Sequence, residues 1–249
     1  MRAGFETDGG FAANGALGLI VLATDETLEP EMRRMIPEQA PLYHSRIPSA
    51  PTVTKETLAA MAGEMTASAA LLPAAGLRAV GYGCTSGATV IGPERVAGLV
   101  GAALPGVPVT DPLSAVIAAL RALGARRLGF LTPYRPEVSA AMRAALEAAG
   151  IEIAAFASYE EEREATVARI AEASTLEAAL RLAAAPGVEA VFASCTNLRT
   201  LGIVEAMETE SGRPFLSSNL ALGWRMLSLA GLRPGAGAPG RLMQGLRAG

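Results

Sequence analysis

The sequence has few of the residues on which many enzyme mechanisms depend. Its 249 residues include one histidine, His44, and one lysine, Lys55. A Ser-His-Asp or Cys-His relay, and a zinc or iron site built on several histidines, are therefore poorly supported. Lys55 lies at an expected helix start in "TVTKETLAAM", which argues against a Schiff-base enzyme. The segment "PLYHSRIP" favours a loop-edge or surface position for His44.

Several binding and targeting signals are also missing. No apolar run reaches the roughly 18 residues of a membrane span, and "MRAGFETDGGFAANG" lacks the pattern of a signal peptide, so we expect a cytoplasmic protein. The net charge of -3 and the lack of basic clusters argue against nucleic acid as a partner. No GxGxxG or GxxxxGK[ST] motif follows a strand, and we expect an enzyme without cofactor or metal.

Apolar runs alternate with helix-like segments along most of the chain, which predicts a parallel α/β architecture. Segments rich in alanine and leucine, such as 113–124 and 138–150, have helical spacing and stop at glycine. We expect an additional strand near "LYHSRIP". The other expected strands cover 16–23, 77–83, 107–110, 126–132, 152–159, 188–194 and 214–219.

Two halves of the chain repeat the same order of segments. "GLIVLATD" corresponds to "LGFLTPYR", and "GVPVTDPLSAVIAALRALG" corresponds to "GRPFLSSNLALGWRMLSLAG". We therefore expect two lobes related by an approximate twofold axis, with the active site in the cleft between them. The expected division is 15–112 plus 218–232 for the N-terminal lobe and 113–217 for the C-terminal lobe. Residues 1–14 and 233–249 are expected to be flexible tails or oligomer contacts, and we expect a homo-oligomer.

The two cysteines occupy matching positions in these halves. Cys84 and Cys195 each end a strand-like run, precede a helix-like segment and are followed by threonine. Because ligand sites in parallel sheets lie beyond the carboxyl ends of the strands, both thiols are expected at one site. The first amides of each helix should favour a thiolate there. The alternative is that both are small buried hydrophobic residues.

Further candidates for substrate binding come from the same strand ends. Their hydroxyl, carboxyl and amide groups can bind a carboxylate or a developing enolate, although helix capping is the alternative role. Ser217, Ser218 and Asn219 lie at the expected chain crossing and close the cleft floor. The acidic run "YEEEREATVARI" is interpreted as a solvated helix start. The expected substrate-binding residues are Asp25, Thr85, Ser86, Tyr134, Thr196, Asn197 and Ser218.

The segments "GYGCTSGATVIG", "SCTNLRTL", "FLTPY" and "PFLSSNLALGW" resemble the maleate cis-trans isomerase and arylmalonate decarboxylase group of the Asp/Glu racemase superfamily. The likeness runs from about Gly15 to Leu232. Within that group, "LATDETLEPEM" and "YHSRIPSAPTVTKETL" look most like the ectoine-utilisation proteins called EutA. The resemblance implies a cofactor-independent enzyme with two lobes around a small carboxylate substrate.

The resemblance also implies roles for the cysteines. In the maleate isomerases, the cysteine matching Cys84 adds to the alkene as a thiolate and the one matching Cys195 supplies a proton. The amino-acid racemases exchange a Cα proton between paired thiols. The decarboxylases keep only the second cysteine and bind the carboxylate in a polar pocket, onto which Thr85, Ser86, Tyr134 and Thr196 would map.

The chain departs from the isomerase pattern at its acidic residues. Asp25 stands where the maleate isomerases usually carry asparagine, and "ASYEEERE" has no clear counterpart of their second substrate-binding asparagine. A substrate with an amino group, such as a diaminobutyrate derivative from ectoine breakdown, would suit Asp25 better than maleate. We expect an isomerase or racemase, with an arylmalonate-type decarboxylase or a non-catalytic protein that binds small acids as alternatives.

Overall fold

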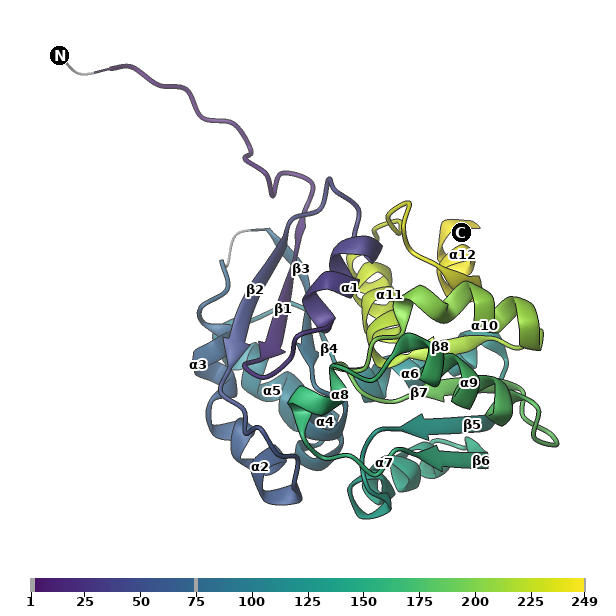
Figure 1. Cartoon of the computed structure of the whole chain (residues 1–249). Coiled ribbons are helices and arrows are strands. Elements are labelled where there is room, and N and C mark those ends of the chain that lie inside the picture. Colours follow the sequence, from purple (N-terminus) through teal and green to yellow (C-terminus); the bar gives the residue numbers. More distant parts are fainter. Residues whose placement is uncertain (1–2, 74–75, 249) are drawn as a thin grey trace.

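The computed structural model describes residues 3–73 and 76–248 of the chain. Two four-stranded sheets lie side by side, and every strand pair in them is parallel (Figure 1). The first sheet has the order β2-β1-β3-β4. Its strands are β1 (Ala16–Leu22), β2 (Leu42–Ile47), β3 (Leu77–Gly83) and β4 (Val109–Thr110).

The second sheet repeats this topology with the order β6-β5-β7-β8. Its strands are β5 (Arg127–Thr132), β6 (Glu152–Ser158), β7 (Ala190–Ala193) and β8 (Phe215–Ser217). In both sheets the first strand pairs with the second and third, and the fourth lies at the edge beside the third. The predicted fold of two similar parallel α/β lobes is confirmed, and so is the additional strand near His44, which is β2.

Helices connect the strands of each lobe. In the first half they are α1 (Leu28–Met35), α2 (Lys55–Ala60), η1 (Met61–Gly63), α3 (Met65–Ala69), α4 (Thr85–Ile91), α5 (Pro93–Ala103) and α6 (Pro112–Leu123). In the second half they are α7 (Pro136–Ala148), α8 (Glu164–Val167), α9 (Glu172–Ala183), η2 (Leu201–Ile203), α10 (Val204–Ser211), α11 (Ser218–Ala230) and α12 (Gly240–Ala248).

Helices α6 and α11 occupy equivalent positions in the two halves. Asp111 caps the start of α6 through its carboxylate, and Ser217 caps α11 through its hydroxyl. Both helices end at a glycine with left-handed backbone, Gly124 and Gly231, which a residue with a Cβ adopts at a cost. The two helices pack against each other, and α11 also packs on β3 of the first sheet. This packing supports our proposed lobe boundaries, in which 218–232 belong to the first lobe.

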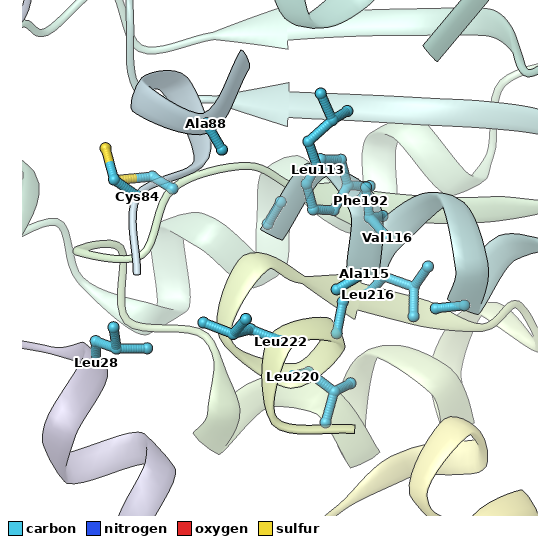
Figure 2. Packing of buried hydrophobic residues seen from close by; sticks show 14 of the residues in the cluster. Leu28, Cys84, Ala88, Leu113, Ala115, Val116, Phe192, Leu216, Leu220 and Leu222 are labelled. Carbon is cyan, nitrogen blue, oxygen red and sulfur yellow. The ribbon is translucent and has the colours of Figure 1, made fainter. Parts of the chain in front are cut away.

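The apolar core runs continuously through both lobes. Strand β1 is buried over its whole length, because it lies in the interior of its sheet with helices on both sides. Figure 2 shows part of the core, with side chains from α6, β7 and α11 in one cluster. Buried area of this kind stabilises the fold by about 25 cal/mol per Å² of apolar surface.

The two ends of the chain differ from each other. Residues 3–14 have no helix or strand and extend away from the lobes (Figure 1). The second expected tail instead contains α12, whose Leu242 and Met243 are buried where it packs on α10 and α11. The many glycines of this segment made the amphipathic helix hard to predict from the sequence. Residues 1, 2 and 249 of the expected tails lie outside the described residues. Among the described residues, no helix is long and apolar enough to cross a membrane.

Candidate active site

The predicted site residues follow the carboxyl ends of the strands. Asp25 comes after β1, Cys84 after β3, Tyr134 after β5 and Cys195 after β7, while Ser218 begins α11 directly after β8. The parallel register places these ends at one side of each sheet, with Val21 beside Gly83 and Leu131 beside Ala193. The two lobes bring these sides together, as the contacts below show.

Cys84 is the N-cap residue of α4. Its backbone is extended, and its sulfur accepts a hydrogen bond from the Gly87 amide at 3.2 Å. Gly87 is required at this point, because a Cβ there would lie 2.9 Å from the Cys84 sulfur and 2.6 Å from the Tyr82 hydroxyl oxygen. The local sequence "CTSG" therefore holds the Cys84 sulfur in a tightly packed position, which we call the seat of Cys84.

Cys195 has a similar local arrangement in the second lobe. Its sulfur accepts a hydrogen bond from the Asn197 amide at 3.3 Å and lies 3.1 Å from the hydroxyl oxygen of Tyr134. The Tyr134 hydroxyl donates to Glu164 Oε1 at 2.6 Å. Both cysteines are free thiols.

A small cavity of about 20 Å³ lies beside these groups at the lobe boundary. Thr24, Ser49, Cys84, Tyr134 and Glu164 contribute to its lining. Two backbone hydrogen bonds close it on one side, from Val53 to Glu162 and from Glu164 to Pro51. Tyr134, which lines this cavity together with Cys84, also contacts the sulfur of Cys195 and so links the two thiols across the lobe boundary.

Burial dominates the electrostatics of both thiols. The pKa of Cys84 is raised to about 12, mainly by loss of solvent and also by the charges of Glu164 and Asp25, while hydrogen bonds from the Gly87 amide and the Tyr82 side chain lower it. Burial likewise raises the pKa of Cys195 well above its ordinary value, and Glu164 acts in the same direction. Our expectation that helix amides would favour thiolates here was wrong, because desolvation outweighs one amide hydrogen bond.

Asp25 is buried and only half satisfied. Its Oδ1 accepts hydrogen bonds from the amides of Thr27 and Leu28, both at 2.8 Å, so it caps the turn before α1. Its Oδ2 has no hydrogen-bond partner among residues 3–73 and 76–248. Burial raises the pKa of Asp25, although these amides and the charge of Arg46 lower it. The carboxyl therefore retains one free oxygen for a donor.

Ser218 connects the two cysteine segments. Its hydroxyl oxygen accepts hydrogen bonds from the Thr85 hydroxyl at 2.7 Å and from the Cys195 amide at 3.0 Å. Thr196 donates its hydroxyl to the Gly83 carbonyl at 3.3 Å, in the residue before Cys84. The contacts of Ser218 with Cys195 and of Thr196 with Gly83 cross the lobe boundary, and together with the Thr85 contact they fix the two cysteine segments relative to each other.

Asn197 and Ser86 lie differently from the other candidates. The Asn197 side chain accepts a hydrogen bond from the Glu26 amide at 2.9 Å and donates to Glu164 Oε2 at 2.7 Å. It therefore joins the lobes and orients Glu164. Ser86 is half-buried in the first turn of α4 and is absent from the lining of the cavity that Cys84 and Tyr134 share.

Glu164 is a site residue that the sequence analysis missed. The acidic run was interpreted as a solvated helix start, but Glu164 is only 4% exposed and bonds both Tyr134 and Asn197. Only its place at the start of an apolar helical pattern, "EATVARI", distinguished it from the neighbouring glutamates. Burial raises the pKa of Glu164, and the charge of Asp25 raises it further.

The acidic and sulfur groups do not form a metal site. Within residues 3–73 and 76–248, no three His, Cys, Asp or Glu side chains are arranged to hold a metal ion. The cavity is instead lined by the Cys84 thiol, the Tyr134 phenol, the Glu164 carboxyl and several hydroxyls, and Tyr134 connects it to Cys195.

Comparison with known proteins identifies the group to which this arrangement belongs. Residues 17–243 match the family described as arylmalonate decarboxylase. The chain belongs to the arylmalonate decarboxylase family. An arylmalonate decarboxylase from Bordetella bronchiseptica is 32% identical over 53% of this chain and 57% of its own length.

Other relatives of this arylmalonate decarboxylase family member are isomerases. A maleate isomerase from Nocardia farcinica is 30% identical and covers 89% of this chain and 93% of its own length. A solved maleate cis-trans isomerase from the same species, a cysteine-to-serine variant with a covalently bound succinylcysteine intermediate, has a TM-score of 0.81 and 27% identity over 93% of this chain and 98% of its own. The predicted membership and the class of cysteine-based isomerase are confirmed.

Proposed function

We propose that the protein isomerises a small organic acid at the carbon next to its carboxylate, with Cys84 and Cys195 as the reacting thiols. The observation that carries this proposal is the shared cavity: Cys84 and Tyr134 line it, and the Tyr134 hydroxyl lies 3.1 Å from the sulfur of Cys195. Sulfurs that reach one substrate from opposite sides can act on different faces of one planar carbon.

The proposed reaction uses the thiols in sequence. The Cys84 thiolate adds to the double bond, the π electron pair moves to the carbon next to the carboxylate, and that carbon takes the proton of Cys195. Rotation about the new single bond is followed by return of the proton to Cys195 and cleavage of the carbon–sulfur bond. In a racemase, one thiolate instead removes the Cα proton and the other thiol protonates the opposite face.

The polar groups of the cavity support binding of a carboxylate. Thr24 and Ser49 present hydroxyls to the cavity, and Thr85 and Thr196 lie beside the cysteines. Hydroxyl and amide donors around a site with little water stabilise developing negative charge, with about 3 kcal/mol lost for each donor removed.

The buried carboxyls support a narrower substrate class. Asp25 and Glu164 both add negative charge near the two thiols, and Asp25 Oδ2 has no partner. Two carboxylates of a substrate would meet this charge, whereas an amino group would neutralise it. We therefore propose a small acid that also carries a cationic amino group. The expected place in ectoine breakdown and the expected homo-oligomer stay predictions.

Deuterium incorporation from heavy water tests the reaction. Maleate, aspartate and diaminobutyrate are incubated with the protein, with Cys84→Ser and with Cys195→Ser, and are followed by NMR. We expect deuterium next to the carboxylate, or a changed double-bond geometry, with at least one substrate, and a loss of 100-fold or more, on the order expected for an acid–base group, in each variant. Ser228→Ala, on a half-buried face of α11, is the control and should keep full activity.

The same assay separates the alternatives. Undiminished exchange in either cysteine variant would remove the paired-thiol mechanism. Release of carbon dioxide from a substituted malonate, with Cys84 dispensable, would indicate a decarboxylase, which the family comparison also represents. Binding of an acid without exchange or conversion would indicate a non-catalytic protein.

A further inference from the structure

Glu164 ends a chain of hydrogen bonds that begins at the thiol of Cys195. The Tyr134 hydroxyl donates to Glu164 Oε1 at 2.6 Å, and its oxygen lies 3.1 Å from the Cys195 sulfur. A phenol has one proton to donate. Because that proton is directed to Glu164, Tyr134 can only accept a hydrogen bond from Cys195, and the S–H of the thiol therefore points to the phenol oxygen.

The surroundings of Glu164 hold it as an acceptor. Tyr134 donates to one carboxyl oxygen, and the Asn197 amide nitrogen donates to the other at 2.7 Å. Both contacts suit an ionised carboxyl, which only accepts hydrogen bonds. The 2.6 Å oxygen–oxygen distance to Tyr134 lies in the range of hydrogen bonds to a charged carboxylate.

We propose that Glu164 is the proton acceptor of Cys195 and acts through Tyr134. In one step the thiol proton passes to the Tyr134 oxygen while the Tyr134 proton passes to Glu164 Oε1. A thiolate, a neutral phenol and a glutamic acid result, and the reverse step restores the thiol. This inference rests on the racemase form of the proposed function, in which the Cys195 thiolate removes the Cα proton of the substrate.

The charges around Glu164 are consistent with this role. Burial and the nearby Asp25 carboxylate raise the pKa of Glu164, which makes it a better base than an exposed glutamate. Cys84 and Cys195 also face it across the cavity, and its charge raises the pKa of each thiol. The arginines of the adjoining segments are paired with other carboxylates, Arg46 with Glu29 and Arg163 with Glu161.

The internal transfer also limits the cost of forming a thiolate. Moving the proton from sulfur to carboxylate leaves the net charge of the buried site unchanged, whereas release to solvent would add one negative charge. The sequence has one histidine, on β2, and Glu164 with Tyr134 does the work that an imidazole would do beside a catalytic cysteine.

The pH dependence of thiol modification tests the proposal without any substrate. In the Cys84→Ser variant, Cys195 is the remaining cysteine. Its reaction with methyl methanethiosulfonate is followed by intact-protein mass spectrometry across neutral and mildly alkaline pH. We expect a nearly constant rate, because the proton that leaves sulfur stays inside the protein. A thiol that loses its proton to water reacts about tenfold faster for each pH unit below its pKa.

Two further substitutions, each added to the Cys84→Ser variant, interrupt the series of hydrogen bonds at different points. Glu164→Gln and Tyr134→Phe should each restore the tenfold increase per pH unit, whereas Glu177→Gln, an exposed residue paired with Arg181 on α9, should keep the constant rate. Three results would overturn the proposal. They are a modification rate that rises tenfold per pH unit in Cys84→Ser itself, a constant rate in both the Glu164→Gln and the Tyr134→Phe variant, and no modification at any pH. If the deuterium assay fails while the modification rate of Cys195 in Cys84→Ser stays constant with pH, the proposed function is rejected and the proton acceptor role of Glu164 is not.

Discussion

The hydroxyl of Thr85 donates to the hydroxyl oxygen of Ser218 at 2.7 Å, and this contact joins the segment after β3 to the start of α11. The same Ser218 oxygen accepts the backbone amide of Cys195 at 3.0 Å. The relative position of the two cysteine segments thus depends on one serine side chain, which is fully buried.

Replacement of this serine is expected to loosen both segments. Ser218→Ala leaves the Thr85 hydroxyl and the Cys195 amide without their acceptor, and each buried donor left unpaired costs about 1–3 kcal/mol. We expect the free energy of unfolding, measured by urea denaturation, to fall by that order and turnover to fall with it. Ser228→Ala on the same helix should change the free energy by less than about 0.5 kcal/mol. Equal stability of the two variants would contradict this prediction.

A methyl group at Gly87 is expected to displace the Cys84 thiol. Its Cβ would lie 2.9 Å from the sulfur and 2.8 Å from the terminal carbon of Met61. We expect Gly87→Ala to lose about 1–3 kcal/mol of stability through overpacking and most of its activity. Gly98→Ala is the matched control in α5, where a Cβ meets nothing within 4 Å and the change should be neutral or stabilising. Full activity in Gly87→Ala would show that the thiol has no fixed seat.

Dicarboxylate binding is expected to tighten as pH falls. Burial raises the pKa of Asp25 and of Glu164, so both carboxyls protonate at a higher pH than exposed ones and their repulsion of a dianion then disappears. Calorimetric titration with maleate should show the dissociation constant decreasing from neutral pH until maleate itself protonates. Asp25→Asn should reduce this dependence, and Asp8→Asn, in the exposed N-terminal segment, should leave it unchanged. Binding that weakens on acidification would refute the charge argument.

Glu31 is expected to make the fold more stable at mildly acidic pH. Its carboxyl accepts the amides of Thr200 and Leu201 at 2.7 and 2.8 Å, but burial raises its pKa above the ordinary value of 4.5. The folded state then binds more protons than the unfolded state between 4.5 and the higher folded pKa. The contribution of Glu31 to stability is therefore complete below 4.5 and is lost as pH rises through the folded pKa.

Urea unfolding over this pH range checks the prediction. Glu31→Gln should flatten the curve, because the replaced group does not titrate. It should also lower the stability, because the glutamine NH2 group cannot accept the Asn219 side-chain amide that Glu31 Oε2 accepts. Glu38→Gln, outside this network in the loop after α1, serves as the charge-matched control. An unchanged pH curve in Glu31→Gln would assign the dependence to other groups.

Much of this arrangement follows from local sequence patterns. The runs that became β1, β3, β5 and β7 were predicted nearly to the residue, because buried parallel strands are uninterrupted apolar segments. The matching "CT" pairs pointed to one cavity because equivalent strand ends meet there. The individual roles of Cys84, Cys195 and the other site residues stay proposals.

The parts that escaped the sequence depend on contacts between distant segments. Glu164 is three residues from Glu161, which is paired with Arg163 outside the site, and only the partners Tyr134 and Asn197 distinguish its environment. The thiol pKa values could not be foreseen for the same reason, since desolvation is a property of the packed lobes. Asp25 was expected to cap a helix or to bind substrate. Its Oδ1 accepts the Leu28 amide at the start of α1, and its Oδ2 is left for a donor from outside the described residues.

The position of α11 has a consequence for how the chain folds during synthesis. This helix covers β3 of the first lobe but is encoded by residues 218–230. While the ribosome is still translating the second half, the first sheet is present without one of its protective helices, and the seat of Cys84 lacks Ser218. The N-terminal half must therefore wait for the synthesis of residues 218–230 before it can mature, which leaves an apolar sheet face open to chaperones until then.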